Sequence, residues 1–450
     1  MKNPAASVRL VVHPGRGFAG AFRPPGDKSV THRAILLALL ANGMTVIENA
    51  NPGRDCSATL RCAEMLGLEG KQRRARFEMV GTGFALTEPD RVLDCGNSGT
   101  TLRLLSGVLA ARPFLSVLEG DASLNRRPVG RVIEPLTRMG ANLWARGGDA
   151  FPPLAIRGAP LHGVEHQLSV ASAQVASSVI FAGLQAEGRT SVTVPGPARD
   201  HTERMLQTLG VPVEIEPLAD GGRRVTVTGP APFAGGSFSV PGDFSAAAFF
   251  LAAAAATPGS AVTGRGVNLN PTRTGLLDVL ERMGAEVERG EVRMESGEEV
   301  GDVTVRGPEQ LVAIEVPREW VPRMLDEIPA WAIAAARARG TSRLRGAAEL
   351  RVKESDRIAA LADGLTRLGV TVREYPDGLE IDGGFVSGGE VDAAGDHRIA
   401  MALAALGVLA RGSVRVAGAE NIETSYPSFV AHCAALGGQV ETVGAAAAAG

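Results

Sequence analysis

Residues 273–289 read RTGLLDVLERMGAEVER, an amphipathic helix-like stretch that ends in Met-Gly and continues as a short strand-like run. A single glycine after a helix is only the usual left-handed cap. Here, however, an apolar residue followed by Gly ends six such stretches, and the glycines lie 68 to 85 residues apart: Leu66-Gly67, Met139-Gly140, Leu209-Gly210, Met283-Gly284, Leu368-Gly369 and Leu436-Gly437. Near-constant spacing of this kind indicates an internal repeat.

Each repeat also holds a more apolar helix-like stretch ahead of the amphipathic one. Examples are SVTHRAILLALLANG (29–43) and HRIAMALAALGVLARG (397–412). Apolar residues on nearly every face are typical of a helix that is buried on most sides. Short β-branched runs separate the helices, so we expect six α/β units in the order β-α-β-α-β, with extra strands between them.

Two near copies of one string suggest where the chain divides. Pro25-Gly26-Asp27-Lys28-Ser29 and Pro241-Gly242-Asp243-Phe244-Ser245 each lie between a strand-like run and a buried helix, and Pro and Gly suit fixed crossings between two bodies. Three repeats lie between the copies and three after the second. We therefore predict two lobes of three units each, one formed by 27–242 and the other by 1–26 plus 243–450.

The composition excludes several classes of protein. The chain has 450 residues, a net charge of -3 and 45% hydrophobic residues, which is globular and offers no general attraction to nucleic acid or anionic membrane. Its four cysteines form no CxxC pair, which favours a reduced compartment. We expect a cytoplasmic protein in which any anion site is local.

Polar residues gather at the predicted starts of the helices. The groups are Asp27-Lys28-Ser29 with Arg33, Gly96-Asn97-Ser98-Gly99-Thr100, Ser172-Ala173-Gln174, Asp326-Glu327, Asp396-His397-Arg398 and Lys353-Glu354-Ser355-Asp356-Arg357. Any one of these is most simply a helix cap. Caps do not explain the cations, because Lys28 or Arg398 in a first turn opposes the helix dipole unless an anion or carboxylate answers it. If these ends meet in one cleft, it selects small anionic ligands.

Two further patterns are decoys. His162-Gly163-Val164-Glu165-His166 matches a zinc motif that needs a helix, and the prolines and glycine around it make a helix unfavourable. The scattered cysteines do not form a nucleophile-and-His motif, which argues against thiol catalysis. We therefore expect no metal.

Eight strings, in order, resemble the 5-enolpyruvylshikimate-3-phosphate synthase family, with wording closer to its bacterial class II than to class I. The match runs from about residue 15 to 437, and the strings read PGDKSVTHRA, GNSGTTLRLL, GDASLNRRPVGRV, ASAQVASSV, RDHTERML, LDEIPAWAIAAA, ELRVKESDRIAAL and GDHRIAMALA. The resemblance implies an α+β, two-lobed enolpyruvyl transferase-like fold (an inverse α/β barrel) of six β-α-β-α-β-β units, three per lobe.

The resemblance also implies an activity in chorismate and aromatic amino acid biosynthesis. The enolpyruvyl group of phosphoenolpyruvate passes to the 5-hydroxyl of shikimate 3-phosphate, and phosphate is released, without a cofactor and in a monomer. The implied shikimate 3-phosphate residues are Lys28, Ser29, Arg33, Ser172, Ala173, Gln174, Arg199, Asp326 and Lys353. Those implied for phosphoenolpyruvate are Lys28, Gly99, Arg127, Gln174, Arg357 and Arg398. Asp326, Glu354 and Lys28 are the candidates for proton transfer, and a Lys crowded by other cations could shuttle protons near neutrality.

The chain departs from the class I pattern at two positions. Ala173 stands where class I has Ser and offers only backbone, and Thr424 stands where class I has a Lys. Gly99 leaves room for the inhibitor glyphosate, whereas the Ala of some tolerant relatives would crowd it. We therefore predict sensitivity to glyphosate.

Two alternative functions are kept beside this one. UDP-N-acetylglucosamine enolpyruvyl transferase shares the fold but usually carries a reactive Cys in the loop that matches 120–128, where this chain has none. A non-catalytic anion-binding repeat protein would have no use for Lys28, Asp326, Glu354 and Arg398 together. Release of phosphate that requires both substrates would separate enzyme from binder.

Overall fold

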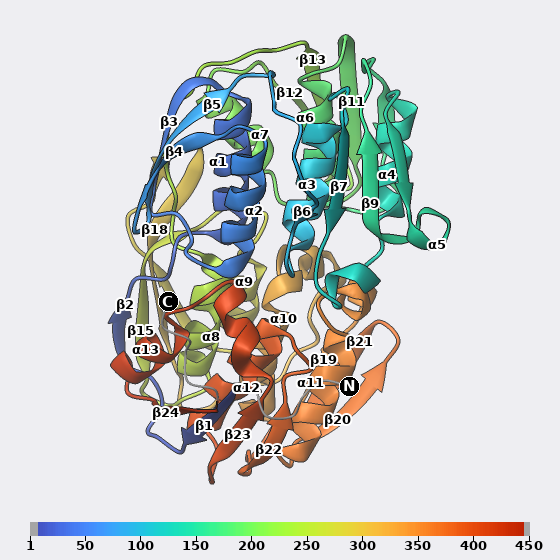
Figure 1. Ribbon diagram of the computed structural model, residues 1–450. Helices are drawn as coiled ribbons and strands as arrows, with labels where there is room; N and C mark the ends of the chain where they lie inside the picture. Colours follow the sequence, from blue (N-terminus) through green and yellow to red (C-terminus); the bar gives the residue numbers. More distant parts are fainter. Residues whose placement is uncertain (1–7, 445–450) are drawn as a thin grey trace. The chain divides into compact units, whose positions relative to one another are not determined.

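The computed structural model describes residues 8–444, so the outer ends of the predicted ranges 1–26 and 243–450 lie outside it. Two kinds of helix alternate along the chain (Figure 1). The first kind is apolar and almost wholly buried: α1 (Lys28–Leu40), α3 (Gly99–Leu109), α6 (Ala173–Gly183), α8 (Phe244–Ala255), α10 (Ile328–Arg337) and α12 (His397–Val408). The second kind is amphipathic: α2 (Arg54–Met65), α4 (Gly130–Arg138), α7 (His201–Thr208), α9 (Gly275–Arg282), α11 (Arg357–Arg367) and α13 (Phe429–Ala435).

The chain divides into two compact units, which we call unit 1 and unit 2. Unit 1 comprises Met1–Pro25, Gly242–Arg293 and Val300–Gly450, and unit 2 comprises Gly26–Pro241 and Met294–Glu299. Each unit has its own hydrophobic core. In unit 2, α3 packs against both α1 and α6, and in unit 1 α8, α10 and α12 pack against one another.

Three sheets surround the buried helices of unit 2. In spatial order they are β14 (Ser237–Ser239), β3 (Asn42–Glu48), β5 (Arg76–Thr82) and β4 (Glu69–Arg73); then β6 (Leu93–Asp94), β7 (Leu115–Glu119), β9 (Phe151–Arg157) and β8 (Asn142–Ala145); then β10 (Glu165–Gln167), β11 (Gly188–Val194), β13 (Arg223–Gly229) and β12 (Glu214–Pro217). In each sheet the first pair is parallel and the others are antiparallel.

Unit 1 repeats this plan. Its sheets are β16 (Glu286–Arg289), β18 (Glu298–Arg306), β15 (Ala261–Asn268) and β2 (Gly20–Phe22), with β17 (Arg293–Glu295) beside β18; then β19 (Thr341–Leu344), β21 (Gly378–Asp382) and β20 (Thr371–Tyr375); then β22 (Gly389–Asp392), β23 (Val414–Ala417), β1 (Arg9–His13) and β24 (Gln439–Val443). The last sheet takes its antiparallel middle strand, β1, from the start of the chain. The sixth repeat is therefore completed by residues that precede the first.

Short helices lie between these elements. They are η2 (Leu124–Arg126), α5 (Arg146–Asp149), η3 (Arg318–Arg323), η4 (Leu325–Glu327), η5 (Ala348–Val352) and η6 (Ala419–Thr424).

The repeated Gly after each amphipathic helix has the expected conformation. Each of the six helices ends at the Leu or Met cap, and the next residue has a positive φ, from +72° at Gly210 to +113° at Gly140. Only glycine adopts this backbone without strain. The six-fold repeat that these residues indicate is confirmed, as is the mixed α/β fold.

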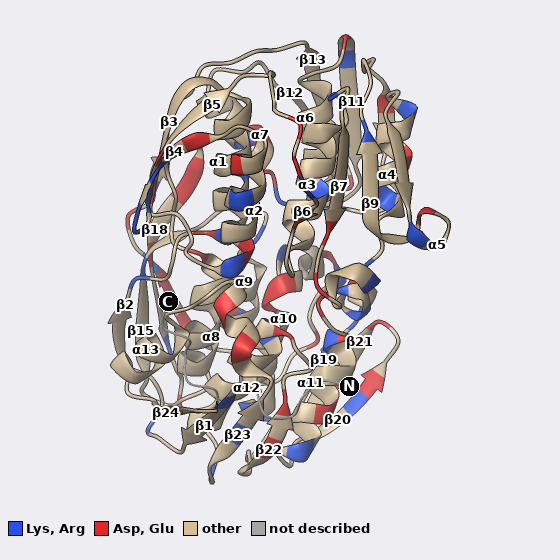
Figure 2. Cartoon of the chain, viewed as in Figure 1, with Lys and Arg blue, Asp and Glu red and all other residues tan. Residues whose placement is uncertain are grey.

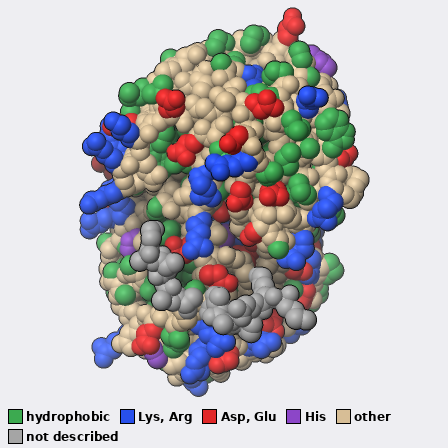
Figure 3. All heavy atoms as spheres, viewed as in Figure 1, with side chains coloured by type: hydrophobic (Ala, Val, Ile, Leu, Met, Phe, Trp, Pro, Cys, Tyr) green, Lys and Arg blue, Asp and Glu red, His purple; other side chains and the backbone are tan. Residues whose placement is uncertain are grey.

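None of the helices formed by the described residues is long and apolar enough to cross a bilayer. On the face that Figure 3 draws, acidic and basic side chains are interspersed with scattered hydrophobic ones. The four cysteines are buried thiols that form no disulfide.

Candidate functional site

Helix α1 of unit 2 begins with a cation that is answered by a carboxylate. Asp27 caps the helix by accepting a hydrogen bond from Val30 N at 3.0 Å. Lys28 is the first helical residue, and its Nζ lies 2.8 Å from Asp55 Oδ2 on α2. Asp55 therefore supplies the counter-charge that a cation in this first turn requires.

One turn further on, Arg33 is held at a buried position. Its Nε donates to Thr202 Oγ1 at 2.7 Å, and its Nη2 donates to Ser177 Oγ at 2.8 Å. Its Nη1 donates to the carbonyl of Ser29 at 3.0 Å, so these two residues share one helix face as predicted. Burial lowers the pKa of Arg33 to about 10, which leaves the guanidinium charged at neutral pH.

Ser29 is also reached from the loop ahead of α7. Arg199 Nη1 donates to Ser29 Oγ at 3.3 Å. Two predicted site residues that are 170 positions apart thus meet at the start of α1.

A buried chain of hydrogen bonds joins α1 to the start of α3. His32 Nδ1 lies 2.7 Å from Thr59 Oγ1, which is 2.6 Å from Thr101 Oγ1, and this hydroxyl donates to the capping Ser98 Oγ at 2.7 Å. Burial, together with Lys28 and Arg33, lowers the pKa of His32 well below its ordinary value. The imidazole is therefore neutral at pH 7 and adds no charge to the site.

The first turn of α3 holds the side chain of Gln174. Its Nε2 donates to Thr100 Oγ1 at 2.9 Å, and its Oε1 accepts from Arg103 Nη1 at 2.8 Å. Gln174 belongs to the first turn of α6, which Ser172 caps through Val175 N at 3.4 Å and which begins at Ala173. Both amide atoms of Gln174 are thus fixed by a neighbouring helix.

Arg127 approaches the same region from the loop after β7. Its guanidinium donates to Asn97 O at 3.0 Å, to Asn97 Oδ1 at 2.6 Å and to Ser123 Oγ at 3.1 Å. The following helix, α4, begins at Gly130. The loop that carries Arg127 therefore continues for two residues beyond it.

In unit 1, the predicted residues gather around Arg357, whose side chain is 1% exposed. Its Nη2 lies 2.6 Å from Glu354 Oε2, its Nε 2.8 Å from Asp396 Oδ2 and its Nη1 3.4 Å from Asp326 Oδ1. Burial alone lowers the pKa of Arg357, but these carboxylates outweigh it, so the pKa lies above the ordinary value.

Asp326 is the meeting point of the other cations of unit 1. Lys353 Nζ lies 3.7 Å from its Oδ1, and Arg398 Nη2 lies 3.9 Å from its Oδ2. Arg398 Nη1 also donates to the carbonyl of Asp326 at 3.0 Å. We call Asp326, Lys353, Glu354, Arg357, Asp396 and Arg398 the unit 1 cluster.

The clusters of the two units differ in composition. The unit 1 cluster contains three cations and three carboxylates. The residues gathered in unit 2 include five cations, Lys28, Arg33, Arg103, Arg127 and Arg199, with Asp55 beside Lys28 and with the charges of Glu203, Asp27 and Glu298 acting on Arg33. Arginines gathered in this way suit a bound anion, and the carboxylates of the unit 1 cluster can accept protons.

Three residues on which these clusters depend were not among the predicted site residues. Asp55 pairs with Lys28, Arg103 holds Gln174 and Asp396 pairs with Arg357. Asp396 was noted only as part of a helix-start string. Arg103 stands one turn after Gly99 in the GNSGTTLRLL string, and that spacing was the one signal that could have found it.

Among residues 8–444 no three or more His, Cys, Asp or Glu side chains are grouped to hold a metal. His166 of the zinc-like motif lies on strand β10 and not on a helix. The expectation of no cofactor stays a prediction. Figure 2 shows that the ribbons of the buried helices α6 and α8 carry no charged residues, whereas strand β20 carries one basic and one acidic residue.

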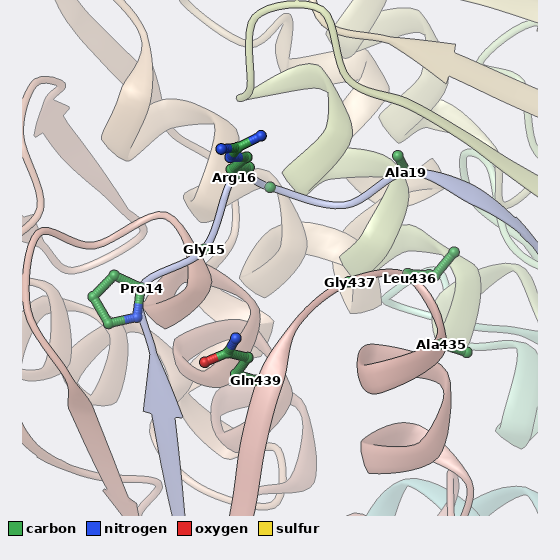
Figure 4. Close-up of a pocket in the computed structure, with 9 residues that line it drawn as sticks. Pro14, Gly15, Arg16, Ala19, Ala435, Leu436, Gly437 and Gln439 are labelled. Atoms are coloured by element: carbon green, nitrogen blue, oxygen red, sulfur yellow. The ribbon is translucent and has the colours of Figure 1, made fainter.

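A hollow of about 630 Å³ lies elsewhere in unit 1, between segments 14–19 and 435–439 (Figure 4). Arg16 is the charged residue of its lining, and Gln439 adds an amide. None of the predicted site residues lines it.

Comparisons with known proteins show which family this chain is similar to. The family model described as EPSP synthase (3-phosphoshikimate 1-carboxyvinyltransferase) matches residues 12–432. The chain belongs to the EPSP synthase family. It is 49% identical over 427 residues to the 3-phosphoshikimate 1-carboxyvinyltransferase of Acidithiobacillus ferrooxidans, covering 94% of this chain and 96% of that relative. The enzyme of the same name from Carboxydothermus hydrogenoformans is 49% identical over 415 residues, covering 92% and 96%.

Solved structures agree with this family. The EPSP synthase of Acinetobacter baumannii is 40% identical and superimposes with a TM-score of 0.86 over 97% of this chain and all of that one. The enolpyruvyl transferase NikO from Streptomyces tendae has a TM-score of 0.77 over 98% of this chain and all of that one, at 18% identity, and this likeness shows the fold alone. The predicted resemblance and the enolpyruvyl transferase-like fold are confirmed.

Proposed function

We propose that this protein transfers the enolpyruvyl group of phosphoenolpyruvate to the 5-hydroxyl of shikimate 3-phosphate and releases phosphate. The observation that carries the proposal is a cation-rich cluster in unit 2 together with the proton-accepting unit 1 cluster, in a chain of the EPSP synthase family. The two substrates bring two phosphates and two carboxylates between them. Such ligands require several Arg and Lys, and Arg offers planar, paired donors to both kinds of group.

The roles of the residues follow from their motif positions and are supported by the contacts in each unit. Shikimate 3-phosphate is held by Lys28, Ser29, Arg33, Ser172, Ala173, Gln174, Arg199, Asp326 and Lys353. Phosphoenolpyruvate is held by Lys28, Gly99, Arg127, Gln174, Arg357 and Arg398. Most of these side chains have hydrogen bonds or ion pairs that fix them before a ligand arrives, which lowers the entropic cost of binding.

The chemistry is an addition followed by an elimination. The 5-hydroxyl of shikimate 3-phosphate gives its proton to a base as its oxygen bonds to C2 of phosphoenolpyruvate, while C3 gains a proton and the C2–C3 double bond becomes single. C3 then loses a proton to a base and the bond from C2 to the phosphate oxygen breaks, which restores the double bond and releases phosphate. Asp326 and Glu354 are the carboxylates available to accept protons, and Lys28 is an available donor.

The proposal also covers how the chain divides. We propose that 1–26 plus 243–450 form one lobe and that 27–242 form the other, and the two compact units support this division. We also propose that the protein works as a cytoplasmic monomer on these small molecules and that glyphosate inhibits it. The last point rests on Gly99, where a Cβ would lie 2.7 Å from Arg103 Nη1 and 3.5 Å from Arg127 Nη1.

Phosphate release tests the proposal directly. Purified protein is given phosphoenolpyruvate and shikimate 3-phosphate, each alone and both together, and the product is identified by mass spectrometry. We expect phosphate only when both are present, with one enolpyruvyl ether formed per phosphate. UDP-N-acetylglucosamine in place of shikimate 3-phosphate should give none. Equal release with the nucleotide sugar, or tight binding of both substrates without turnover, would contradict the proposal.

A further inference from the structure

Gly99, the first residue of α3, leaves a space that a guanidinium fills. A Cβ at this position would lie 2.7 Å from Arg103 Nη1 and 3.5 Å from Arg127 Nη1. The backbone of Gly99 is helical and needs no positive φ, so an alanine fits the chain itself. The group that would have to move is therefore the flexible end of Arg103.

Moving that end has a specific consequence. The same atom, Arg103 Nη1, donates to Gln174 Oε1 at 2.8 Å, and Nη2 donates to Pro128 O at 3.3 Å, next to Arg127. Arg103 thus connects α3 both to α6 and to the loop that carries Arg127. A shift of about 1 Å is enough to break a hydrogen bond of this length.

The contact also sets which way the Gln174 amide faces. Its Oε1 accepts from Arg103, and its Nε2 donates to Thr100 Oγ1. Without the guanidinium, Thr100 remains as a single anchor, and its hydroxyl can bond either end of the amide. Gln174 would then rotate, and a ligand would find its donor and acceptor exchanged in part of the molecules.

We propose that Arg103 is a positioning residue for Gln174, and that Gly99 is required because its missing side chain leaves room for the Arg103 guanidinium. The inference rests on the proposed function only where substrates are used to measure it. Arg103 acts through Gln174 and the Arg127 loop and is not assigned a contact with substrate. A methyl at residue 99 acts on the site through Arg103, whatever direct contact it makes with a ligand.

Kinetics of four proteins test this coupling: the parent, Gly99→Ala, Arg103→Ala and the double variant. Loss of a hydrogen bond from a charged group corresponds to about tenfold to hundredfold. We expect Arg103→Ala to raise KM for phosphoenolpyruvate by that factor, with a smaller change in kcat, and Arg103→Lys to recover part of it. Gly99→Ala should raise KM about tenfold in the parent but change it less than about twofold when Arg103 is already Ala.

The matched control is Arg189→Ala, because Arg189 is an exposed arginine of the same unit that pairs with Glu214. It should leave KM unchanged. Equal effects of Gly99→Ala in both backgrounds would overturn the coupling. An inactive parent would instead refute the proposed function.

A crystal structure of ligand-free Gly99→Ala tests the same idea without substrates. We expect Arg103 Nη1 to lie more than 3.5 Å from Gln174 Oε1. If the contact stays at its present length, the inference is wrong regardless of the activity.

Discussion

Helices α1 and α8 begin with almost the same string but use it differently. Each follows Pro-Gly-Asp, and the aspartate, Asp27 or Asp243, caps the helix through its side chain. The next residue is Lys28 in unit 2 and Phe244 in unit 1. Lys28 keeps a charged head beside Asp55, whereas Phe244 is wholly buried in the core of its unit.

The loop after the next strand carries an arginine in both units, but the two arginines differ in their contacts. Asn51-Pro52-Gly53-Arg54 in unit 2 corresponds to Asn270-Pro271-Thr272-Arg273 in unit 1. Arg273 turns inward: its Nη2 lies 3.0 Å from Asp243 Oδ1 and 2.9 Å from Ser245 Oγ, and Ser245 in turn donates to Glu327. With its side chain only 1% exposed, Arg273 fills the helix start from within.

The difference teaches that a repeated helix start is not by itself a ligand site. In unit 1 the internal cation Arg273 pairs with the capping aspartate. In unit 2 the cation comes from the helix itself, pairs with Asp55 and remains 13% exposed. The same backbone motif therefore serves structure in one unit, and under the proposed function it supplies a binding group in the other.

Removing the charge of Lys28 should have the largest effect. Lys28→Met deletes a charged partner that both substrates are proposed to use, so we expect kcat/KM to fall about 10⁴-fold, as for two charge-assisted hydrogen bonds of up to about 3 kcal/mol each. Steady-state kinetics and calorimetric binding of shikimate 3-phosphate measure it. Asp55→Asn in the same background is the control for the unpaired carboxylate. A loss of less than tenfold in kcat/KM would mean that Lys28 does not bind the substrates and serves only the structure, as Phe244 does.

Breaking the internal pair of unit 1 should lower stability rather than substrate affinity. Arg273→Met leaves Asp243 buried without its cation, and we expect the free energy of unfolding of unit 1 to fall by about 4 kcal/mol. Urea unfolding followed by hydrogen exchange assigns the loss to its unit. Arg289→Met, which removes a more exposed arginine of unit 1, serves as the matched control. Wild-type stability of Arg273→Met would show that the pair is not structural.

Acid should lower the stability of the unit that contains α1, because α1 carries His32 where α8 has Ala248. Burial, together with Lys28 and Arg33, lowers the folded-state pKa of His32 below its ordinary value of 6.5, so the unfolded chain binds the extra proton first. The free energy of unfolding should therefore fall as pH decreases below 6.5, by at most about 1.4 kcal/mol per pH unit for this group. His166 and His432, whose pKa values burial also lowers, add to the slope. Parent and His32→Gln are compared between pH 7 and 5, and identical slopes would exclude His32.

Exchanging the capping carboxylates for amides should give the smallest of these effects, a difference in stability between variants of α1 and α8. Asp27→Asn keeps a good N-cap, and we expect a loss of about 1 kcal/mol or less. Asp243→Asn keeps the cap as well but removes the charge that Arg273 needs, so its loss should be clearly larger. Thermal unfolding of the two variants, made in the same background, measures the difference. Equal losses would mean that the pair with Arg273 contributes nothing beyond the cap.

Local patterns explain why much of this could be predicted. The glycines after the amphipathic helices adopt positive φ for reasons contained in two or three residues, and the apolar helices are buried because of their own composition. Ser29 and Arg33 share a face because of helical spacing alone. The requirement for a counter-charge at Lys28 also follows from its position in a first turn.

The partners of these groups could not be predicted in the same way. Asp55, Arg103 and Asp396 reach their partners across 27, 71 and 39 positions of the chain, and their neighbours in the sequence do not indicate which residue each one contacts. The hairpin segment 294–299 likewise joins unit 2, where Glu298 meets the buried His201 at 2.7 Å. No periodicity in those six residues indicates it.

By itself, the amino-acid sequence determined the six-fold repeat, the two kinds of helix and the family, because caps, periodicity and motif strings are local properties. Only the tertiary structure decided which repeated helix start keeps a charged head available and which is filled by Arg273. That choice depends on pairing between loops distant in sequence, since a buried charge is stabilised by whichever partner the fold brings within hydrogen-bonding distance.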